Sequence, residues 1–97
     1  MTTFSVTARY EVAPENFPKV VELLESVRSR SLQEPGCRMY EFHLSADDPS
    51  VIFILEQYEA AEDFDRHCST PHFIEIVKAQ IVPLLRSRTV TKGSPLF

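Results

Sequence analysis

Glycine and cysteine are scarce in this chain of 97 residues, and tryptophan is absent. The two cysteines, Cys37 and Cys68, form no CxxC pair, so neither a zinc site nor a disulfide scaffold is expected. We expect both to be buried free thiols. The chain also has no GxGxxG, no P-loop and no nucleophile elbow. A motif-encoded nucleotide, flavin or nicotinamide site is therefore excluded, and no cofactor is predicted.

Basic charge and long apolar runs are also lacking. Ten Lys and Arg stand against fourteen Asp and Glu, which gives a formal net charge of −4, and no basic cluster forms a nucleic-acid footprint. The N-terminus lacks a charged segment followed by a long apolar stretch, so neither a signal peptide nor a membrane span is predicted. We expect a cytoplasmic protein without a nucleic-acid or membrane partner.

Apolar material is plentiful, because 43% of the chain is hydrophobic and it includes seven Phe and three Tyr. The length fits one domain, predicted over residues 1–97 with a core at about 4–91. We find no internal repeat, linker or low-complexity segment. One core is therefore expected, with apolar side chains left over for a pocket or an interface.

The hydrophobic periodicity predicts an α+β fold. Alternation predicts strands at 4–12, 37–45 and 51–58, and a weaker final strand at 87–91. Helical spacing predicts a helix opened by Pro14, a short helix at 60–68, and a third helix opened by Ser69-Thr70-Pro71 and ended or kinked by Pro83. This order is the ferredoxin-like β-α-β-β-α-β plan, an antiparallel sheet with helices on one face. The stripes expected for the two longer helices are Phe17, Val20, Val21, Leu24, Val27 and Leu32, and Phe73, Ile74, Val77, Ile81, Leu84 and Leu85.

The third predicted strand begins with five apolar residues, 51–55. Such a run needs cover on both faces, and the predicted helices cover only one. The sequence therefore predicts a homodimer. By parity, Phe53 and Leu55 should meet the partner sheet, while the helix-facing side holds Ile52, Ile54, Glu56 and Tyr58.

Titratable side chains leave several interpretations open. His67 and His72 are five residues apart across a helix break, which is not the spacing of two metal ligands on one helical face, and no acidic ligand accompanies them. No metal site is predicted. His72 could instead cap or pack its helix, and His67 could lie at a cavity edge. A partly buried Glu56 could act as a general acid or base, or could pair with an arginine or with the partner chain.

Aromatic side chains should gather between the sheet and the helices. They would form either core packing or a flat apolar pocket for an aromatic ligand. The set comprises Tyr10, Tyr40, Phe42, Phe64 and Phe73.

Several short motifs follow one another along the chain: Glu34-Pro35-Gly36-Cys37, Tyr40-Glu41, Asp48-Pro49, Glu56-Gln57-Tyr58, His67-Cys68-Ser69-Thr70-Pro71-His72-Phe73 and Pro83-Leu84-Leu85. This ordered set resembles the antibiotic biosynthesis monooxygenase domain family, from about Phe4 to Leu85. The resemblance implies a dimeric α+β barrel with a pocket between each sheet and its own helices. Members of this family include cofactor-independent oxygenases of polycyclic phenols, quinol monooxygenases, haem-degrading enzymes and an isomerase of phosphorylated autoinducer-2. The resemblance therefore implies one of these activities. Many relatives carry Trp where Tyr58 stands, and haem degradation is not expected here.

The leading hypothesis from this resemblance is a cofactor-independent monooxygenase of a small phenolic or quinol substrate. His67 would be the base or proton shuttle, because histidine titrates near neutral pH. Glu56 and Tyr40 would complete the catalytic set, and the substrate-binding set would be Tyr58, Phe64, His72 and Phe73.

Two alternatives stay open. An isomerase or other proton-transfer enzyme would need cations in its pocket, yet Arg9 and Arg38 should point away from it. A non-catalytic, ligand-binding dimeric domain is the other alternative. An open pocket reached by His67 would count against this last interpretation.

Overall fold

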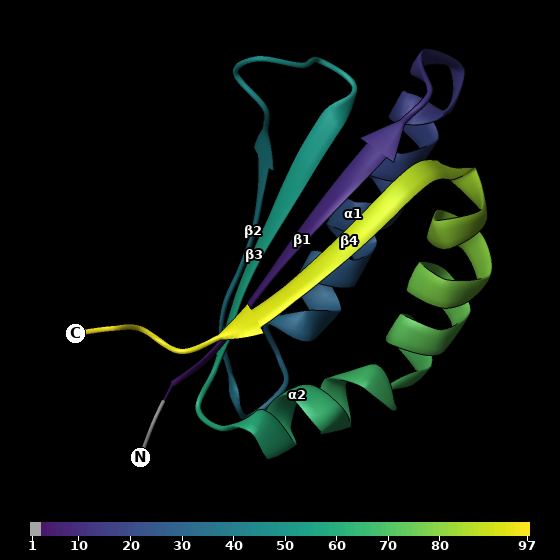
Figure 1. Cartoon of the computed structure of the whole chain (residues 1–97). Helices are drawn as coiled ribbons and strands as arrows, with labels where there is room; N and C mark the ends of the chain where they lie inside the picture. The colour runs from purple at the N-terminus through teal and green to yellow at the C-terminus, as the bar shows by residue number, and fades with distance from the viewer. Residues whose placement is uncertain (1–2) are drawn as a thin grey trace.

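The computed structural model describes residues 3–97 and contains one four-stranded sheet. The strand order is β2-β3-β1-β4, and every neighbouring pair is antiparallel (Figure 1). β1 therefore lies inside the sheet between β3 and β4, while β2 and β4 form the edges. The strands are β1 (Phe4–Val12), β2 (Cys37–Leu44), β3 (Val51–Tyr58) and β4 (Leu85–Gly93).

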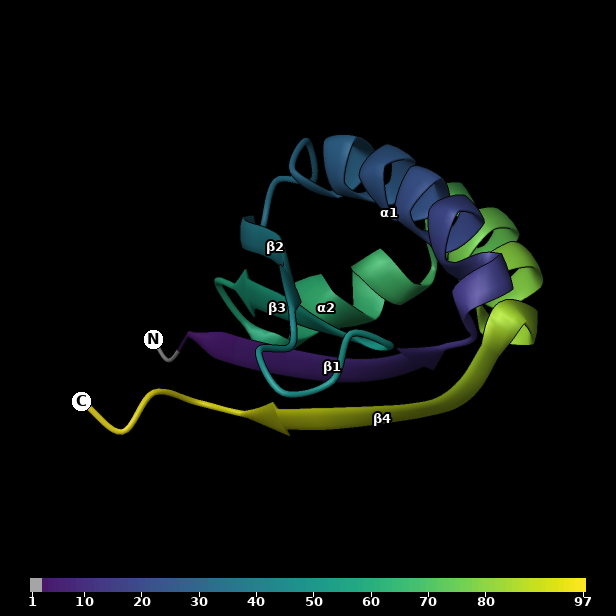
Figure 2. The same cartoon turned by 90° about the horizontal axis from the view of Figure 1, so that it is seen from above.

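The helical segments lie on one face of this sheet, as Figure 2 shows from above. Together with the strand order, this confirms the predicted ferredoxin-like α+β fold. Among residues 3–97, every helix is too short or too polar to cross a bilayer. The segments are η1 (Pro14–Asn16), α1 (Phe17–Ser31), α2 (Ala61–Cys68), the π-helix η2 (Phe73–Ile81) and η3 (Val82–Leu84).

Strands β1 and β3 alternate as predicted. In β3 the side chains that face the helices are at most 6% exposed, whereas Phe53 and Leu55 on the opposite face are only half-buried. The predicted parity of β3 is therefore confirmed, and contact of its outer face with a second copy remains a prediction. The buried residues of β1 are Val6, Ala8, Tyr10 and Val12.

The predicted stripe of α1 is wrong at two positions. Val21 and Leu32 are 43% and 39% exposed, whereas Leu23 is buried. Steps of three and four residues from Val20 lead to Leu23, Leu24 and Val27, and Val21 lies about 100° around the helix from Val20. The buried face of α1 consists of Val20, Leu23, Leu24, Val27 and Ser31.

The third predicted helix is a π-helix. The amide of Val82 donates to the carbonyl of Val77, five residues earlier, so the turn is wider than in an α-helix. This changes the side-chain spacing: Ile74 is 48% exposed and Ile76 is buried instead. Pro83 lies in η3, where the helical segment ends as predicted, and β4 follows at once.

The cysteines are free, as expected, but both are only half-buried, so the expectation of burial is wrong. Cys37 opens β2 at the sheet edge, where the Cys37 thiol lies near the Met39 carbonyl. Burial raises the pKa of Cys37 to about 11, which makes this thiol unreactive at neutral pH.

Candidate functional site

His67 lies on the buried face of α2 and is 1% exposed. The short helix is fixed at its start, where the Asp63 carboxylate accepts a 3.0 Å hydrogen bond from the Ala60 amide. Phe64 and His67 are three residues apart, so both face β3. This packing holds the imidazole between the sheet and the helices rather than at the edge of a cavity.

The structure brings the other six predicted site residues together around His67. Its ring contacts those of two strand tyrosines, with centroid distances of 5.5 Å to Tyr40 and 5.6 Å to Tyr58. Its Nε2 lies 4.0 Å from Oε1 of Glu56. The remaining contacts are with the rings of Phe64 at 6.1 Å, His72 at 5.9 Å and Phe73 at 5.3 Å.

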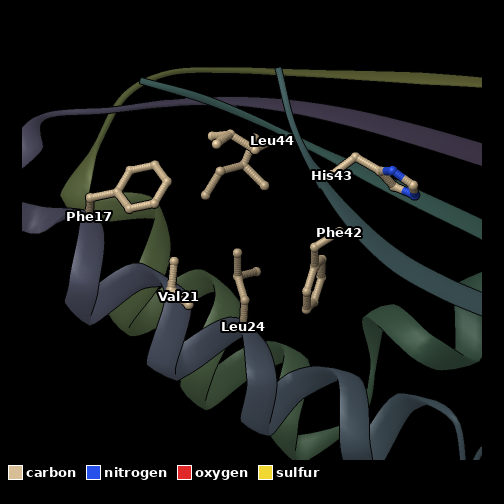
Figure 3. Close-up of a pocket in the computed structure, with 7 residues that line it drawn as sticks. Phe17, Val21, Leu24, Phe42, His43 and Leu44 are labelled. Atoms are coloured by element: carbon tan, nitrogen blue, oxygen red, sulfur yellow. The ribbon is translucent and has the colours of Figure 1, made fainter. Parts of the chain in front are cut away.

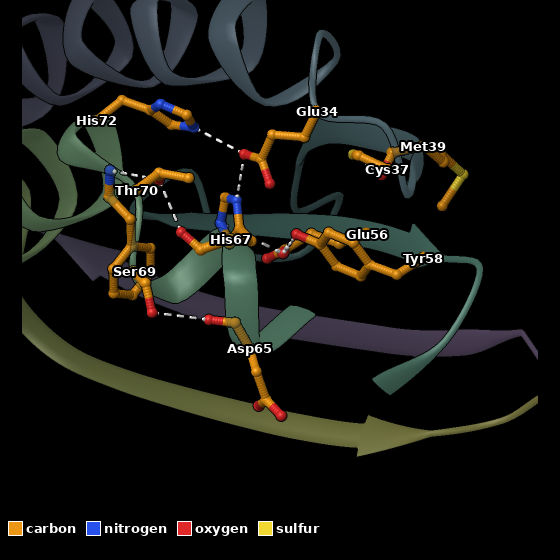
Figure 4. A network of polar contacts seen from close by, with 11 residues as sticks. Glu34, Cys37, Met39, Glu56, Tyr58, Asp65, His67, Ser69, Thr70 and His72 are labelled. Atoms are coloured by element: carbon orange, nitrogen blue, oxygen red, sulfur yellow. Dashed lines mark hydrogen bonds and ion pairs between the residues drawn. The ribbon is translucent and has the colours of Figure 1, made fainter. Parts of the chain in front are cut away.

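Glu34 completes the site and was not predicted. Its Oε2 lies 2.8 Å from Nδ1 of His67 and 2.7 Å from Nε2 of His72, as Figure 4 shows. The sequence placed Glu34 only in the motif Glu34-Pro35-Gly36-Cys37 of the family resemblance, which gave it no role in the site. An acidic residue placed directly before a strand was the signal available, but nothing local links it to histidines more than thirty residues later.

Gly36 allows this loop to approach α2 closely. A β-carbon at Gly36 would overlap the Asp63 carboxylate. The carbonyl of Gly36 also accepts a 2.9 Å hydrogen bond from the Glu59 amide. Glycine therefore lets the segment that carries Glu34 pack against the start of α2.

The hydrogen bonds fix the tautomer of His67. A carboxylate only accepts, so both imidazole nitrogens near Glu34 Oε2 must donate to it. In the neutral ring the proton is then on Nδ1, and Nε2 keeps its lone pair. Nε2 is buried and has no hydrogen-bond partner. Burial lowers the pKa of His67, which favours this neutral form.

Glu56 lies at the centre of β3 and is 6% exposed. The hydroxyl of Tyr58 donates a 2.5 Å hydrogen bond to its Oε1. Within residues 3–97 no arginine forms an ion pair with Glu56, and pairing with a partner chain stays a prediction. Burial raises the pKa of Glu56 to about 7, although the bond from Tyr58 opposes the shift. Burial and the neighbouring Glu56 charge raise the pKa of Tyr58 far above its usual value. Glu56 can therefore exchange a proton near neutral pH.

His72 does not cap its helix. The hydroxyl of Thr70 accepts a 3.2 Å hydrogen bond from the Phe73 amide instead, and it donates a 2.7 Å bond to the His67 carbonyl. The predicted Ser or Thr cap is thus Thr70. His72 remains free to bind Glu34 through Nε2.

Glu34, His67 and His72 could hold a metal ion. One ligand atom from each side chain lies within 4.8 Å of the other two. Two imidazoles and a carboxylate are common ligands of zinc and of non-haem iron. The expectation that no acidic ligand accompanies the histidines is therefore wrong, because the chain brings Glu34 to them from a distant loop.

Two hollows open on the surface, and His67 lines neither. One, of about 160 Å³, lies between α1 and the β2–β3 edge of the sheet and is almost wholly apolar (Figure 3). Phe42 separates it from the site, since its ring contacts Tyr40 edge-on at 5.6 Å. The first hollow is lined by Phe17, Val21, Leu24, Phe42, His43, Leu44 and Ile52, and the second by Val12, Pro14, Phe17, Pro18, Pro49 and Ser50.

Comparison with known proteins gives a consistent result. The chain is 31% identical over 93 residues to "Putative monooxygenase Rv0793" of Mycobacterium tuberculosis, covering 95% of this chain and 90% of that protein. The solved structure of Rv0793 matches with a TM-score of 0.92, covering 99% of this chain and 97% of that one. A conserved protein from Methanosarcina mazei, 24% identical, shares the fold with a TM-score of 0.91 over 96% and 92% of the two chains. The family model described as "Antibiotic biosynthesis monooxygenase" matches residues 3–79, so the chain belongs to the antibiotic biosynthesis monooxygenase family.

Proposed function

We propose that the protein is a homodimeric, cofactor-independent monooxygenase of a small phenolic or quinol substrate. The observation that carries this proposal is the buried, unpartnered Nε2 of His67, held with its lone pair free by Glu34. A base of this kind can take the hydroxyl proton of a phenol. Membership of a monooxygenase family and the 31% identical relative support the reaction class.

In this proposal Nε2 of His67 removes the substrate proton, and the resulting imidazolium is stabilised by Glu34. The electron-rich anion then passes an electron to O₂. One oxygen atom enters the substrate, and the other leaves as water with two hydrogens from the substrate. The reaction therefore balances without an external reductant or a bound cofactor.

The surroundings of His67 suit such an anion. Tyr40 and Phe64 are buried, and Phe73 packs edge-on against the imidazole, so water has little access. Polar groups act more strongly in such a dry site than in water. Protonated Glu56, which accepts the hydrogen bond from Tyr58, would supply the hydrogen that stabilises the developing charge.

A proton-transfer enzyme such as an isomerase is a second candidate. It is favoured by the Glu56–His67 pair, in which an acid with a pKa of about 7 lies 4.0 Å from a neutral imidazole nitrogen. Such a pair can remove a proton at one carbon and return it at another. This reaction would proceed without oxygen.

A non-catalytic ligand-binding role is favoured by a different observation. The apolar hollow beside Phe42 is open, whereas His67 lines neither hollow. From the hollow beside Phe42, a substrate would reach Nε2 only after side chains move, because Phe42 and Tyr40 lie between them. A binding protein would need no such movement.

Oxygen uptake tests these functions against one another. Purified wild type and the His67→Gln variant are each mixed with a panel of quinols and anthrones in an oxygen electrode. The matched control is His43→Gln, because His43 is exposed and hydrogen-bonded to Glu41 in a similar Glu–His pair. Uptake that His67→Gln alone removes would support the oxygenase. Anaerobic conversion would support the isomerase, and binding without conversion would support the binding domain.

A further inference from the structure

We propose that Glu34, His67 and His72 form a binding site for a divalent transition metal such as zinc. The three side chains come from three segments: the loop after α1, the end of α2 and the residue before η2. Their donor atoms are Oε2, Nδ1 and Nε2 respectively. This inference goes beyond the proposed oxygenase reaction and does not depend on it.

The distances suit a metal after a small adjustment. Each nitrogen lies 2.7–2.8 Å from the same carboxylate oxygen. At a tetrahedral zinc ion about 2.1 Å from each donor, any two donors lie about 3.4 Å apart. The donors lie within 4.8 Å of one another, so the two nitrogens need to approach by up to about 1.4 Å while each moves about 0.6–0.7 Å away from the carboxylate oxygen. The two hydrogen bonds thus hold the ligands in a nearly assembled set.

The unpartnered Nε2 of His67 lies on the side of the ring opposite the proposed donor atom Nδ1. With a metal on Nδ1, the ring proton moves to Nε2, and that N–H faces Oε1 of Glu56 at 4.0 Å. Metal-bound histidines usually donate their other N–H to a carboxylate or carbonyl. In the metal-bound form this N–H would need to close the 4.0 Å gap to Glu56 in order to satisfy the buried atom that has no partner in the metal-free protein.

The site is reachable from outside. The side chains of Glu34 and His72 are 13% and 11% exposed, whereas His67 is 1% exposed. An ion and a water ligand can therefore enter from the side of Glu34 and His72. Two imidazoles and one carboxylate are borderline donors that prefer zinc, cobalt or iron to magnesium or calcium.

Metal binding would also change the proposed chemistry. A proton on Nε2 removes the lone pair that the oxygenase proposal needs. We therefore expect the zinc-bound form to lack oxygen uptake, and chelation to restore it. Metal binding itself is measured without any substrate, so failure of the oxygenase proposal leaves this test intact.

The experiment titrates chelator-treated protein with Zn²⁺ and with Co²⁺ in a calorimeter, and follows the ring nitrogens of wild type by NMR. We expect one ion per chain, with Zn²⁺ shifting the signals of His67 and His72 and leaving His43 unchanged. Glu34→Gln and His72→Gln should each weaken binding at least about tenfold, and Glu56→Gln about tenfold through His67. The control, His43→Gln, should bind like wild type.

Several results would overturn the site. These are a wild type that binds neither ion, zinc-induced shifts confined to His43, and unchanged affinity in folded Glu34→Gln and His72→Gln. The NMR measurement uses wild type alone, so it decides the matter even where a variant does not fold. Thermal unfolding provides a further readout, because an ion that binds only the folded state raises Tm in wild type.

Discussion

At the residue scale the site depends on which nitrogen of His67 carries the proton. Glu34 fixes this by accepting from Nδ1, and His72 holds Glu34 by donating to the same oxygen. The three side chains act as a unit, in which only His67 reaches towards Glu56. In the proposed reaction, Glu34 is thus a positioning residue rather than one that touches the substrate.

Replacing Glu34 should misplace the base without removing it. In metal-free Glu34→Gln we expect kcat for oxygen uptake to fall about tenfold with little change in KM, because the amide can also donate and no longer enforces the Nδ1–H tautomer. A long-range ¹H–¹⁵N NMR spectrum reports that tautomer directly. Glu41→Gln is the matched control, since Glu41 binds the exposed His43. A wild-type spectrum with the proton on Nε2 would refute the assignment.

Glu56 should make stability depend on pH. Its pKa is about 7 in the folded protein against an ordinary 4.5, so the folded state holds this proton more tightly than the unfolded state. The stabilisation is complete below about pH 4.5 and is lost as pH rises through 7, for a total of up to about 3 kcal/mol. The facing groups are Tyr58, Tyr40, Cys37, Tyr10, Arg88, His67, Cys68 and Glu34.

Glu56→Gln isolates this contribution. The buried His67 has the opposite effect, because its pKa is lowered in the folded state. Its contribution to the free energy of unfolding is lost as pH falls below about 6.5. We therefore compare the free energies of unfolding of wild type and Glu56→Gln in urea with chelator, between pH 5 and pH 8. Wild type should lose stability relative to the variant as pH rises. A difference independent of pH would show that Glu56 titrates normally.

At the element scale, the loop between α1 and β2 positions Glu34 against α2. We expect Gly36→Ala to lower Tm by several degrees, because its β-carbon displaces Asp63 and so weakens the cap of α2, a loss of about 0.5–2 kcal/mol. Gly93→Ala is the control, since its β-carbon would meet nothing within 4 Å. Equal Tm values for the two variants would contradict this role of Gly36.

The elements also show what local sequence can and cannot predict. The alternation of β1 and β3 predicted their buried faces, because a strand has only two faces and burial of one fixes the other. Helical stripes were less certain, as Val21 and Ile74 show, since neighbouring positions differ by only about 100° and η2 has a wider turn. Glu34 was missed because its partners are 33 and 38 residues away, and only the tertiary fold brings them together.

At the scale of the whole molecule, the outer face of the sheet should join two copies. Phe53 and Leu55 on that face are half-buried in a single chain. Phe53→Lys should shift the dimer towards monomer at least tenfold in dissociation constant, because a charge would be buried between the sheets. Val21→Lys on α1 should leave the dissociation constant of the dimer unchanged. Sedimentation measures both, and a monomeric wild type would refute the homodimer.

The central claim is that His67 is the base of an oxygen-consuming reaction. Its most direct test is the rate of oxygen uptake by chelator-treated protein with its best quinol or anthrone, for wild type, His67→Gln and His43→Gln. We predict a loss of about a hundredfold or more for His67→Gln alone. Equal rates for wild type and His67→Gln, with both proteins folded, would contradict the claim.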